Sequence, residues 1–153
     1  MRSVEPQVRR VVTCFLENGG QILVLRRSQR VGTYRGKWGA VAGYVEDGET
    51  PEQAARKEIL EETGIADAEL VRTGRPYEFL DEGIGVLWVI HPFRFRVKSR
   101  EVRLDWEHDE ARWIDPAELE GMDTVPHLAD SWKRVSGEER AVEDEEGDEG
   151  QTG

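Results

Sequence analysis

Alternation between apolar runs and turn-forming residues divides the first part of the chain into strands. Residues 8–16 and 21–27 are apolar runs of strand length. Glu-Asn-Gly-Gly at residues 17–20 predicts a tight hairpin between them, because asparagine and glycine tolerate positive φ angles. Since residues 22–25 are apolar without interruption, the second strand is expected to be buried on both faces. A shorter strand is predicted at 38–45.

Three further strands are predicted near residues 68–80, 84–97 and 110–114. Pro92 interrupts the middle of the second one. Because proline has no backbone N–H to donate to a neighbouring strand, we expect a bulge or an edge position there.

A helix is predicted at 51–63 by signals at both of its ends. Thr-Pro-Glu-Gln at residues 50–53 combines a capping residue, a proline suited to the first helical position and a glutamine that completes a capping box. Gly64 is placed to end the helix in the left-handed conformation. Shorter helices are expected after Asp115 and from Pro126. With the strands, the pattern predicts an α/β fold.

The 153 residues suffice for one domain, which we place at residues 1–136. The net charge of −11 is uneven, because residues 137–153 hold eight acidic residues against one basic residue, a net −7. Such an acidic segment without aromatic residues is expected to stay solvated and disordered. No broad basic surface is predicted, so the chain is not expected to bind nucleic acid as a scaffold.

The single cysteine, Cys14, lies in an apolar strand and is interpreted as a small buried residue rather than a disulfide partner. The first residues, MRSVEPQ, lack the apolar segment of a signal peptide. The longest strictly apolar run, residues 86–90, is far too short to span a bilayer. A cytoplasmic protein without a membrane segment is therefore expected.

Three glutamates gather on one stripe of the helix predicted at 51–63. At about 100° per residue, Glu58, Glu61 and Glu62 share a face, and Glu49 lies just before the first turn. Two like charges three or four residues apart lower the stability of a helix by about 0.2–0.5 kcal/mol per pair when no counter-ion is bound. Carboxylate oxygens are the ligands that hard cations such as Mg²⁺ prefer. The stripe is typical of a divalent-metal site, although solvent-facing glutamate-rich helices are also common.

The complete spacing of this segment resembles the signature of the Nudix hydrolase family. That signature is a glycine, five residues, a glutamate, seven residues, and then Arg-Glu-aliphatic-any-Glu-Glu-any-Gly-aliphatic. The resemblance covers about residues 8–135, extends to archaeal Nudix domains, and implies an α/β/α sandwich around a mixed β-sheet. The nine defined positions hold Gly43, Glu49, Lys57, Glu58, Ile59, Glu61, Glu62, Gly64 and Ile65, and all of them except Lys57 match the signature.

Four of these residues are expected to support the metal ligands rather than to bind the metal. They are Gly43, Glu49, Lys57 and Gly64. Lys57 is the one departure, since the family has arginine there, and that arginine normally pairs with the first glutamate, here Glu49. A lysine supplies the charge but not the two-pronged geometry of a guanidinium. The orientation of Glu49 is therefore in question, whereas the ligand set is intact.

The resemblance implies a metal-dependent enzyme that cleaves the diphosphate bond of a nucleoside diphosphate linked to another group. Mg²⁺ or Mn²⁺ would be held by Glu58, Glu61 and Glu62, with the backbone carbonyl of Ala42 completing the site. The general base varies within the family, so Glu61, Glu58 and Glu107 stay open as catalytic candidates. For Glu107 a surface position in a loop is an equal alternative. A nucleotide-binding sensor without turnover is the alternative function.

Substrate contacts are less clearly indicated. Arg26 and Arg27 end a strand near the expected site and are candidates to bind a substrate phosphate, with strand-end solvation as the alternative. Tyr44, Trp38 and Trp88 are candidates to stack on a base or sugar, although a packing role is favoured for each. The expected partner is a small nucleotide-type substrate, its identity is open, and a homodimer is considered possible.

Overall fold

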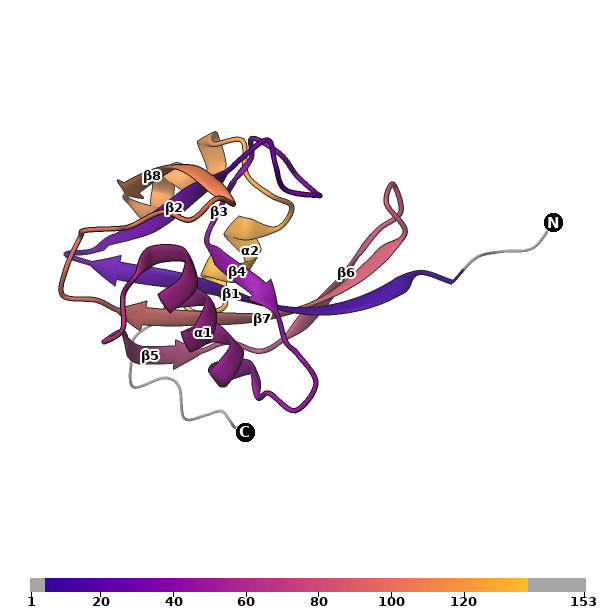
Figure 1. Cartoon of the computed structure of the whole chain (residues 1–153), viewed down its shortest axis with the longest axis horizontal. Coiled ribbons are helices and arrows are strands. Elements are labelled where there is room, and N and C mark those ends of the chain that lie inside the picture. Colours follow the sequence, from indigo (N-terminus) through magenta and orange to yellow (C-terminus); the bar gives the residue numbers. More distant parts are fainter. Residues whose placement is uncertain (1–4, 138–153) are drawn as a thin grey trace.

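The computed structural model describes residues 5–137, so residues 138–153 of the acidic segment lie outside the described part. An eight-stranded sheet occupies the middle of the fold (Figure 1). The strands are β1 (Gln7–Asn18), β2 (Gln21–Arg27), β3 (Trp38–Gly39), β4 (Val41–Tyr44), β5 (Glu69–Thr73), β6 (Tyr77–Asp81), β7 (Val86–Arg96) and β8 (His108–Ile114). The helices are α1 (Pro51–Thr63), the 3₁₀ helix η1 (Pro116–Gly121) and α2 (Leu128–Lys133).

The sheet is mixed, as expected. Its main path runs β3-β2-β1-β7-β5, while β4 pairs with β1, β6 with β7 and β8 with β2. The pairing of β1 with β7 is parallel along almost the whole length of both strands, and the other pairings are antiparallel. The β1–β2 hairpin turns at Gly19 and Gly20, both at positive φ, which confirms the predicted turn.

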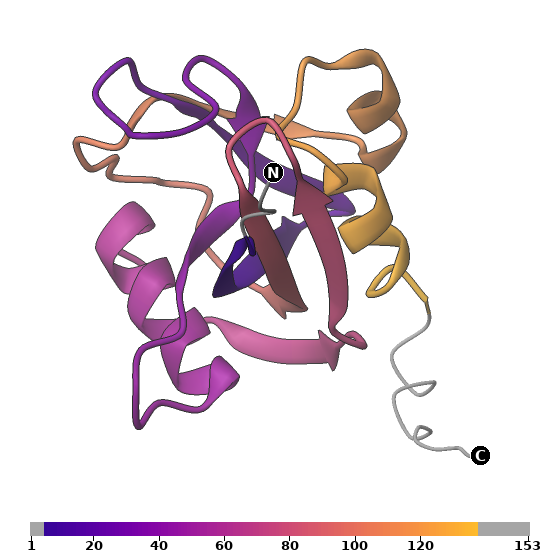
Figure 2. The ribbon, with the colours of Figure 1, turned by 90° about the vertical axis from the view of Figure 1, so that its right-hand side faces the viewer.

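Helices cover both faces of the sheet, so the expected α/β/α arrangement is confirmed. Figure 2 shows α1 on one side of the strands and η1 and α2 on the other. Alternate residues of β1 and β2 enter two separate cores. Cys14 and Leu23 pack in the core that contains Ile59 of α1, whereas Phe15 and Val24 pack in the core beneath η1 and α2. The apolar run of β2 is thus buried on both faces because each face has its own helical cover.

The prediction of one continuous strand at 68–80 is wrong. It forms β5 and β6, which separate at residues 74–76 and pair with different parts of β7. Gly74 is needed at the break because a Cβ there would lie 2.9 Å from both Pro92 and Val135. Its N–H donates to the Pro92 carbonyl at 2.9 Å.

The expectation for Pro92 is corrected by the same break. Pro92 lies within β7, which is an interior strand between β1 and the β5–β6 pair, and the register shift falls at residues 70–72 of β5. Because the Pro92 carbonyl faces Gly74, its missing N–H also faces the gap between β5 and β6. The proline therefore breaks no ladder hydrogen bond, and neither a bulge nor an edge is required at its own position.

Helix α1 has the predicted bounds and the predicted caps. The Thr50 side chain accepts from the Gln53 N–H at 3.1 Å, the Gln53 side chain accepts from the Thr50 N–H at 2.9 Å, and Gly64 adopts φ 80°. Ala54, Ala55 and Ile59 are buried against the sheet. These contacts fix the rotation of α1 so that its glutamate stripe lies beside β4. Over residues 5–137, none of the helices is both long and apolar enough to cross a membrane.

Candidate active site

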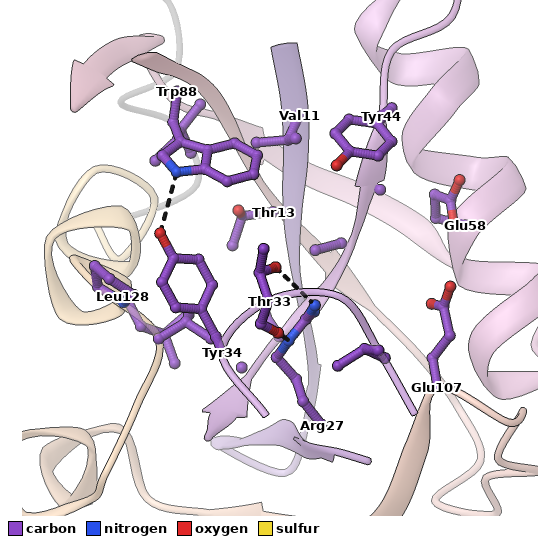
Figure 3. Close-up of a pocket in the computed structure, with 18 of the residues that line it drawn as sticks. Val11, Thr13, Arg27, Thr33, Tyr34, Tyr44, Glu58, Trp88, Glu107 and Leu128 are labelled. Carbon is purple, nitrogen blue, oxygen red and sulfur yellow. Dashed lines mark hydrogen bonds between the residues drawn. The ribbon is translucent and has the colours of Figure 1, made fainter. Parts of the chain in front are cut away.

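A cavity of about 400 Å³ lies between α1 and β4 on one side and β7 and α2 on the other. Figure 3 shows Glu58 and Glu107 on one side of this cavity, with Tyr34 and Trp88 on the opposite side. The carboxylate of Glu61 belongs to the same acidic side. The cavity therefore has a charged end and an aromatic end, and the acidic side brings together the three side chains expected to be catalytic.

Glu62 lies beneath the acidic side of the cavity and is only 1% exposed. Its Oε1 accepts from the Ala42 N–H at 3.3 Å, whereas its Oε2 has no hydrogen-bond partner among the described residues. Burial, and then the neighbouring Glu58 carboxyl, raise the pKa of Glu62 well above its usual value. A buried carboxylate oxygen without a donor is costly, and a bound cation would compensate it.

Gly43 permits the close approach of β4 to α1. A Cβ at this position would overlap the carboxyl carbon of Glu58. The glycine is therefore explained by the space that the Glu58 side chain occupies. Glu58 is half-buried in this position, and burial is the main cause that raises its pKa.

Lys57 forms the ion pair that the sequence left in question. Its Nζ lies 2.9 Å from Glu49 Oε2, and Glu49 Oε1 accepts from the Glu46 N–H at 2.9 Å. The hydrogen bond to Lys57 is the main cause that lowers the pKa of Glu49. Lysine thus braces the loop before α1 through one contact, and the backbone of Glu46 supplies the second one.

Glu107 lies in the turn before β8 and lines the cavity, rather than occupying only the surface. The turn is attached to the end of β2 through Ser28. The Ser28 N–H donates to the Glu107 carbonyl at 2.8 Å, and the Ser28 hydroxyl donates to the Trp106 carbonyl at 3.0 Å. Burial, and then the nearby Asp105, raise the pKa of Glu107.

The two arginines at the end of β2 have different environments. Arg27 lines the cavity, and its guanidinium donates to the Thr33 carbonyl at 2.9 Å and to the Thr33 hydroxyl at 3.3 Å (Figure 3). Arg26 lies outside the cavity lining and pairs with Asp109 at 2.8 Å and Glu110 at 3.3 Å. Of the two, only Arg27 is positioned to meet a ligand in this cavity.

The aromatic end is organised by Tyr34, which the sequence did not single out. Its hydroxyl donates to Asp81 at 2.6 Å and accepts from the Trp88 indole at 3.2 Å. Burial and the bond to Asp81 raise the pKa of Tyr34 to about 12, so the phenol stays protonated at neutral pH. Tyr34 lies in an irregular loop and bonds to residues far away in the chain, so no local pattern pointed to it.

Of the three aromatic candidates from the sequence, Trp88 and Tyr44 line the cavity and Trp38 does not. Tyr44 lines the cavity and is 47% exposed, with the Arg9 guanidinium 5.4 Å from its ring centre. Trp38 is buried, lies outside the cavity lining and contacts Arg26 and Arg112 through its ring face, which is a packing role.

The residues beside the cavity fit a divalent cation. Ligand atoms of Glu62, Glu107 and His108 all lie within 4.8 Å of one another. Glu58 and Glu61 line the cavity next to them. Carboxylates in this number suit a hard divalent ion, and the unpartnered Glu62 oxygen is an available ligand.

Residues 7–136 match the family model described as NUDIX domain. This chain belongs to the Nudix family. Like other Nudix hydrolases it is an enzyme that acts on phosphoric anhydride bonds, and two of the signature carboxylates, Glu58 and Glu61, line the cavity.

Relatives and solved structures agree with this assignment. The nucleoside triphosphatase NudI of Escherichia coli O139:H28 is 29% identical over 123 residues, which cover 72% of this chain and 84% of NudI. The crystal structure of the MutT NUDIX hydrolase from Burkholderia pseudomallei has a TM-score of 0.71 and 26% identity, covering 84% of this chain and 98% of that one. The crystal structure of the MutT protein from Methanosarcina mazei Go1 has a TM-score of 0.69 and 28% identity, covering 86% of this chain and 95% of that one.

Replacing Gly43 by alanine tests whether its role is to admit the Glu58 side chain. We expect Gly43→Ala to displace the Glu58 carboxylate and lower hydrolysis about 100-fold. Stability should change by less than about 1 kcal/mol, because the obstructing atoms belong to a side chain that can move. Gly121→Ala is the matched control, since a Cβ there meets no atom within 4 Å. Activity unchanged by Gly43→Ala would show that the position of Glu58 is unimportant.

The raised pKa of Glu62 predicts how the stability of the metal-free protein depends on pH. Above the pKa of an ordinary glutamate, the folded protein retains a proton that the unfolded chain releases. The free energy of unfolding therefore falls as pH rises through the raised folded-state pKa. We expect urea denaturation in EDTA to show this fall in the wild type and a smaller fall in Glu62→Gln. Identical pH profiles for the two proteins would contradict the burial of an ionisable Glu62.

Proposed function

We propose that this Nudix hydrolase is a Mg²⁺- or Mn²⁺-dependent pyrophosphohydrolase of nucleotides. Its substrate would be a nucleoside diphosphate linked to another group, cleaved at the diphosphate bond. The observation that carries the proposal is the two-ended cavity, in which carboxylates that suit a cation lie opposite aromatic side chains that suit a base or sugar. A diphosphate would lie between these ends.

Glu58, Glu61 and Glu62 are the side chains proposed to hold the cation, with Ala42 beside them in the cavity wall. When bound, the cation would neutralise phosphate oxygens and lower the pKa of the attacking water. The protein's part is to hold these carboxylates still. Caps at both ends of α1 and the close packing of Gly43 supply that rigidity.

A carboxylate must accept the proton of the attacking water as its oxygen bonds to phosphorus and the bridging P–O bond breaks. Glu61, Glu58 and Glu107 all line the cavity and stay candidates for this base. Glu107 lies on the same side of the cavity as Glu58 and sits on a turn that Ser28 fixes. Its raised pKa brings it closer to the pH at which a general base is most effective.

The rest of the cavity supports a nucleotide-type substrate. Arg27 is proposed to bind a phosphate, since its charge lies within the cavity and a guanidinium matches phosphate geometry. Trp88 and Tyr34 offer aromatic surface for the nucleoside. Tyr44 is proposed to cover the cavity from the β4 side. The nucleoside triphosphatase NudI supports testing nucleoside triphosphates first.

A nucleotide sensor without turnover is the alternative, and the complete acidic side of the cavity argues against it, because binding alone has little need for so many carboxylates. A cytoplasmic location and a homodimer stay predictions from the sequence.

The decisive assay incubates the protein with nucleoside di- and triphosphates, ADP-ribose and dinucleotides, with and without Mg²⁺. We expect metal-dependent hydrolysis of at least one substrate by the wild type. Glu61→Gln should lower turnover by about 10²–10⁴-fold if Glu61 is the base, because the amide cannot take a proton. Product analysis by chromatography identifies the bond that is cleaved.

Glu52→Gln is the matched control for this assay. Glu52 belongs to the same helix but lies outside the cavity lining and pairs with Arg56 at 3.1 Å. Equal activity of the wild type and Glu61→Gln would remove Glu61 from the catalytic set. Metal-dependent turnover of none of the substrates, with nucleotide binding retained, would favour the sensor over the enzyme.

A further inference from the structure

The buried imidazole of His108 lies between two carboxylates on the protein side of the cavity. Its Nδ1 is 3.1 Å from Asp105 Oδ1, and its Nε2 is 3.9 Å from Glu62 Oε1. The His108 side chain is 4% exposed and the Glu62 side chain 1%. The imidazole is thus enclosed by protein, and each of its nitrogens faces one carboxylate.

The contact with Asp105 determines which nitrogen carries the proton of the neutral ring. An ionised carboxylate only accepts hydrogen bonds, so Nδ1 is the donor and Nε2 keeps its lone pair. Histidines that bind metals commonly donate their other N–H to a carboxylate in this way, which fixes the ring and its tautomer. The lone pair of His108 therefore points toward the Glu62 carboxylate.

The distance between His108 and Glu62 suits a shared ion better than a direct bond. At 3.9 Å, Nε2 and Oε1 are too far apart for a hydrogen bond. Two ligands that each lie about 2.0–2.2 Å from one metal ion are separated by up to roughly 4 Å. Glu62 Oε1 also accepts from the Ala42 N–H, whereas Oε2 has no partner among the described residues, so the carboxylate as a whole retains an unused acceptor.

The third ligand comes from the residue before His108, in the turn that precedes β8. Glu107, Glu62 and His108 bring their ligand atoms within 4.8 Å of one another. The turn is held in place by the two hydrogen bonds of Ser28 and by the Asp105 carboxylate, which accepts from the Glu107 N–H at 3.3 Å. A register shift between β2 and β8 makes Asp109 an extra residue, and His108 is directed inward while Asp109 is exposed.

We propose that Glu62, Glu107 and His108 form a mixed nitrogen–oxygen metal position in which His108 Nε2 is a direct ligand. This rests on the proposed function, because Glu62 is shared with the carboxylate set that is expected to hold the catalytic cation. Imidazole favours transition metals, whereas Mg²⁺ favours sites made of oxygen ligands alone. The enzyme should therefore bind Mn²⁺ or Co²⁺ in preference to Mg²⁺ at this position.

Two substitutions separate a ligand role of His108 from a role in holding the turn. His108→Asn retains an amide donor near Nδ1 for Asp105 but has no atom at the Nε2 position. His108→Gln places an amide group near Nε2 and offers an oxygen ligand instead of nitrogen. His127→Asn is the matched control, because His127 also pairs with a carboxylate three residues away, Asp130 at 2.7 Å, and asparagine tolerates its positive φ.

The experiment titrates the full-length protein with MnCl₂ alone and with MgCl₂ alone, without nucleotide, and records pulsed electron paramagnetic resonance of the Mn²⁺ form. We expect coupling of Mn²⁺ to ¹⁴N in the wild type and in His127→Asn, and none in either His108 variant. The Mn²⁺ affinity of His108→Asn should fall by at least about tenfold. His108→Gln should lose the preference for Mn²⁺ over Mg²⁺, because its site contains oxygen ligands only.

Absence of ¹⁴N coupling in the wild type, or its persistence in both His108 variants, would overturn the proposal. Metal affinities unchanged in His108→Asn would do the same, and circular dichroism of each metal-free variant verifies that it is folded. A failure of this proposal can be distinguished from a failure of the proposed function. A wild type that hydrolyses nucleotides without ¹⁴N coupling rejects only the histidine ligand, whereas ¹⁴N coupling without any turnover rejects only the hydrolase function.

Discussion

The burial of the Glu62 carboxylate is the constraint on which the site depends. Three parts of the chain that are distant in sequence meet at this side chain: α1 carries it, β4 donates to it from Ala42, and His108 at the start of β8 faces it. One of its oxygens has no protein partner among the described residues. A carboxylate in such a place destabilises the fold unless a proton or a cation compensates it. The burial of this carboxylate therefore supports the proposed cation site.

The rest of the fold holds these three parts in place. The parallel pairing of β1 with β7 sets the charged and aromatic ends of the cavity at a fixed distance, because β1 also carries β4 and β7 carries Trp88. The two apolar cores on opposite faces of the sheet fix α1 on one side and α2 on the other. The carboxylates are thus held by packing, whereas the aromatic end is held by a loop and one hydrogen-bonded tyrosine.

Local signals were sufficient for the elements that carry the signature. The helix at 51–63 and its caps follow from residues that interact within four positions, and the hairpin at Gly19 and Gly20 follows from two glycines that are adjacent. The strand at 68–80 was wrong because its division depends on Gly74 packing against Pro92 and Val135, which no local pattern reveals. The effect of Pro92 was misjudged for the same reason.

Within the site, long-range contacts decided what the sequence left open. The sequence alone does not distinguish Arg26 from Arg27 as a phosphate ligand. Neighbouring residues of a strand point to opposite faces, and of these two only Arg27 lines the cavity. Lys57 pairs with one oxygen of Glu49, and the backbone N–H of Glu46 donates to the other. Tyr34 and His108 owe their positions to partners on other elements, so their importance appears only in three dimensions.

The most direct test of this account is a crystal structure of the protein grown with MnCl₂, with anomalous diffraction recorded at a wavelength sensitive to manganese. We predict an anomalous peak within about 2.5 Å of a Glu62 carboxylate oxygen, bounded by the carboxylates of the acidic side. A peak confined to another part of the surface, with both Glu62 oxygens still without a metal, would contradict the account.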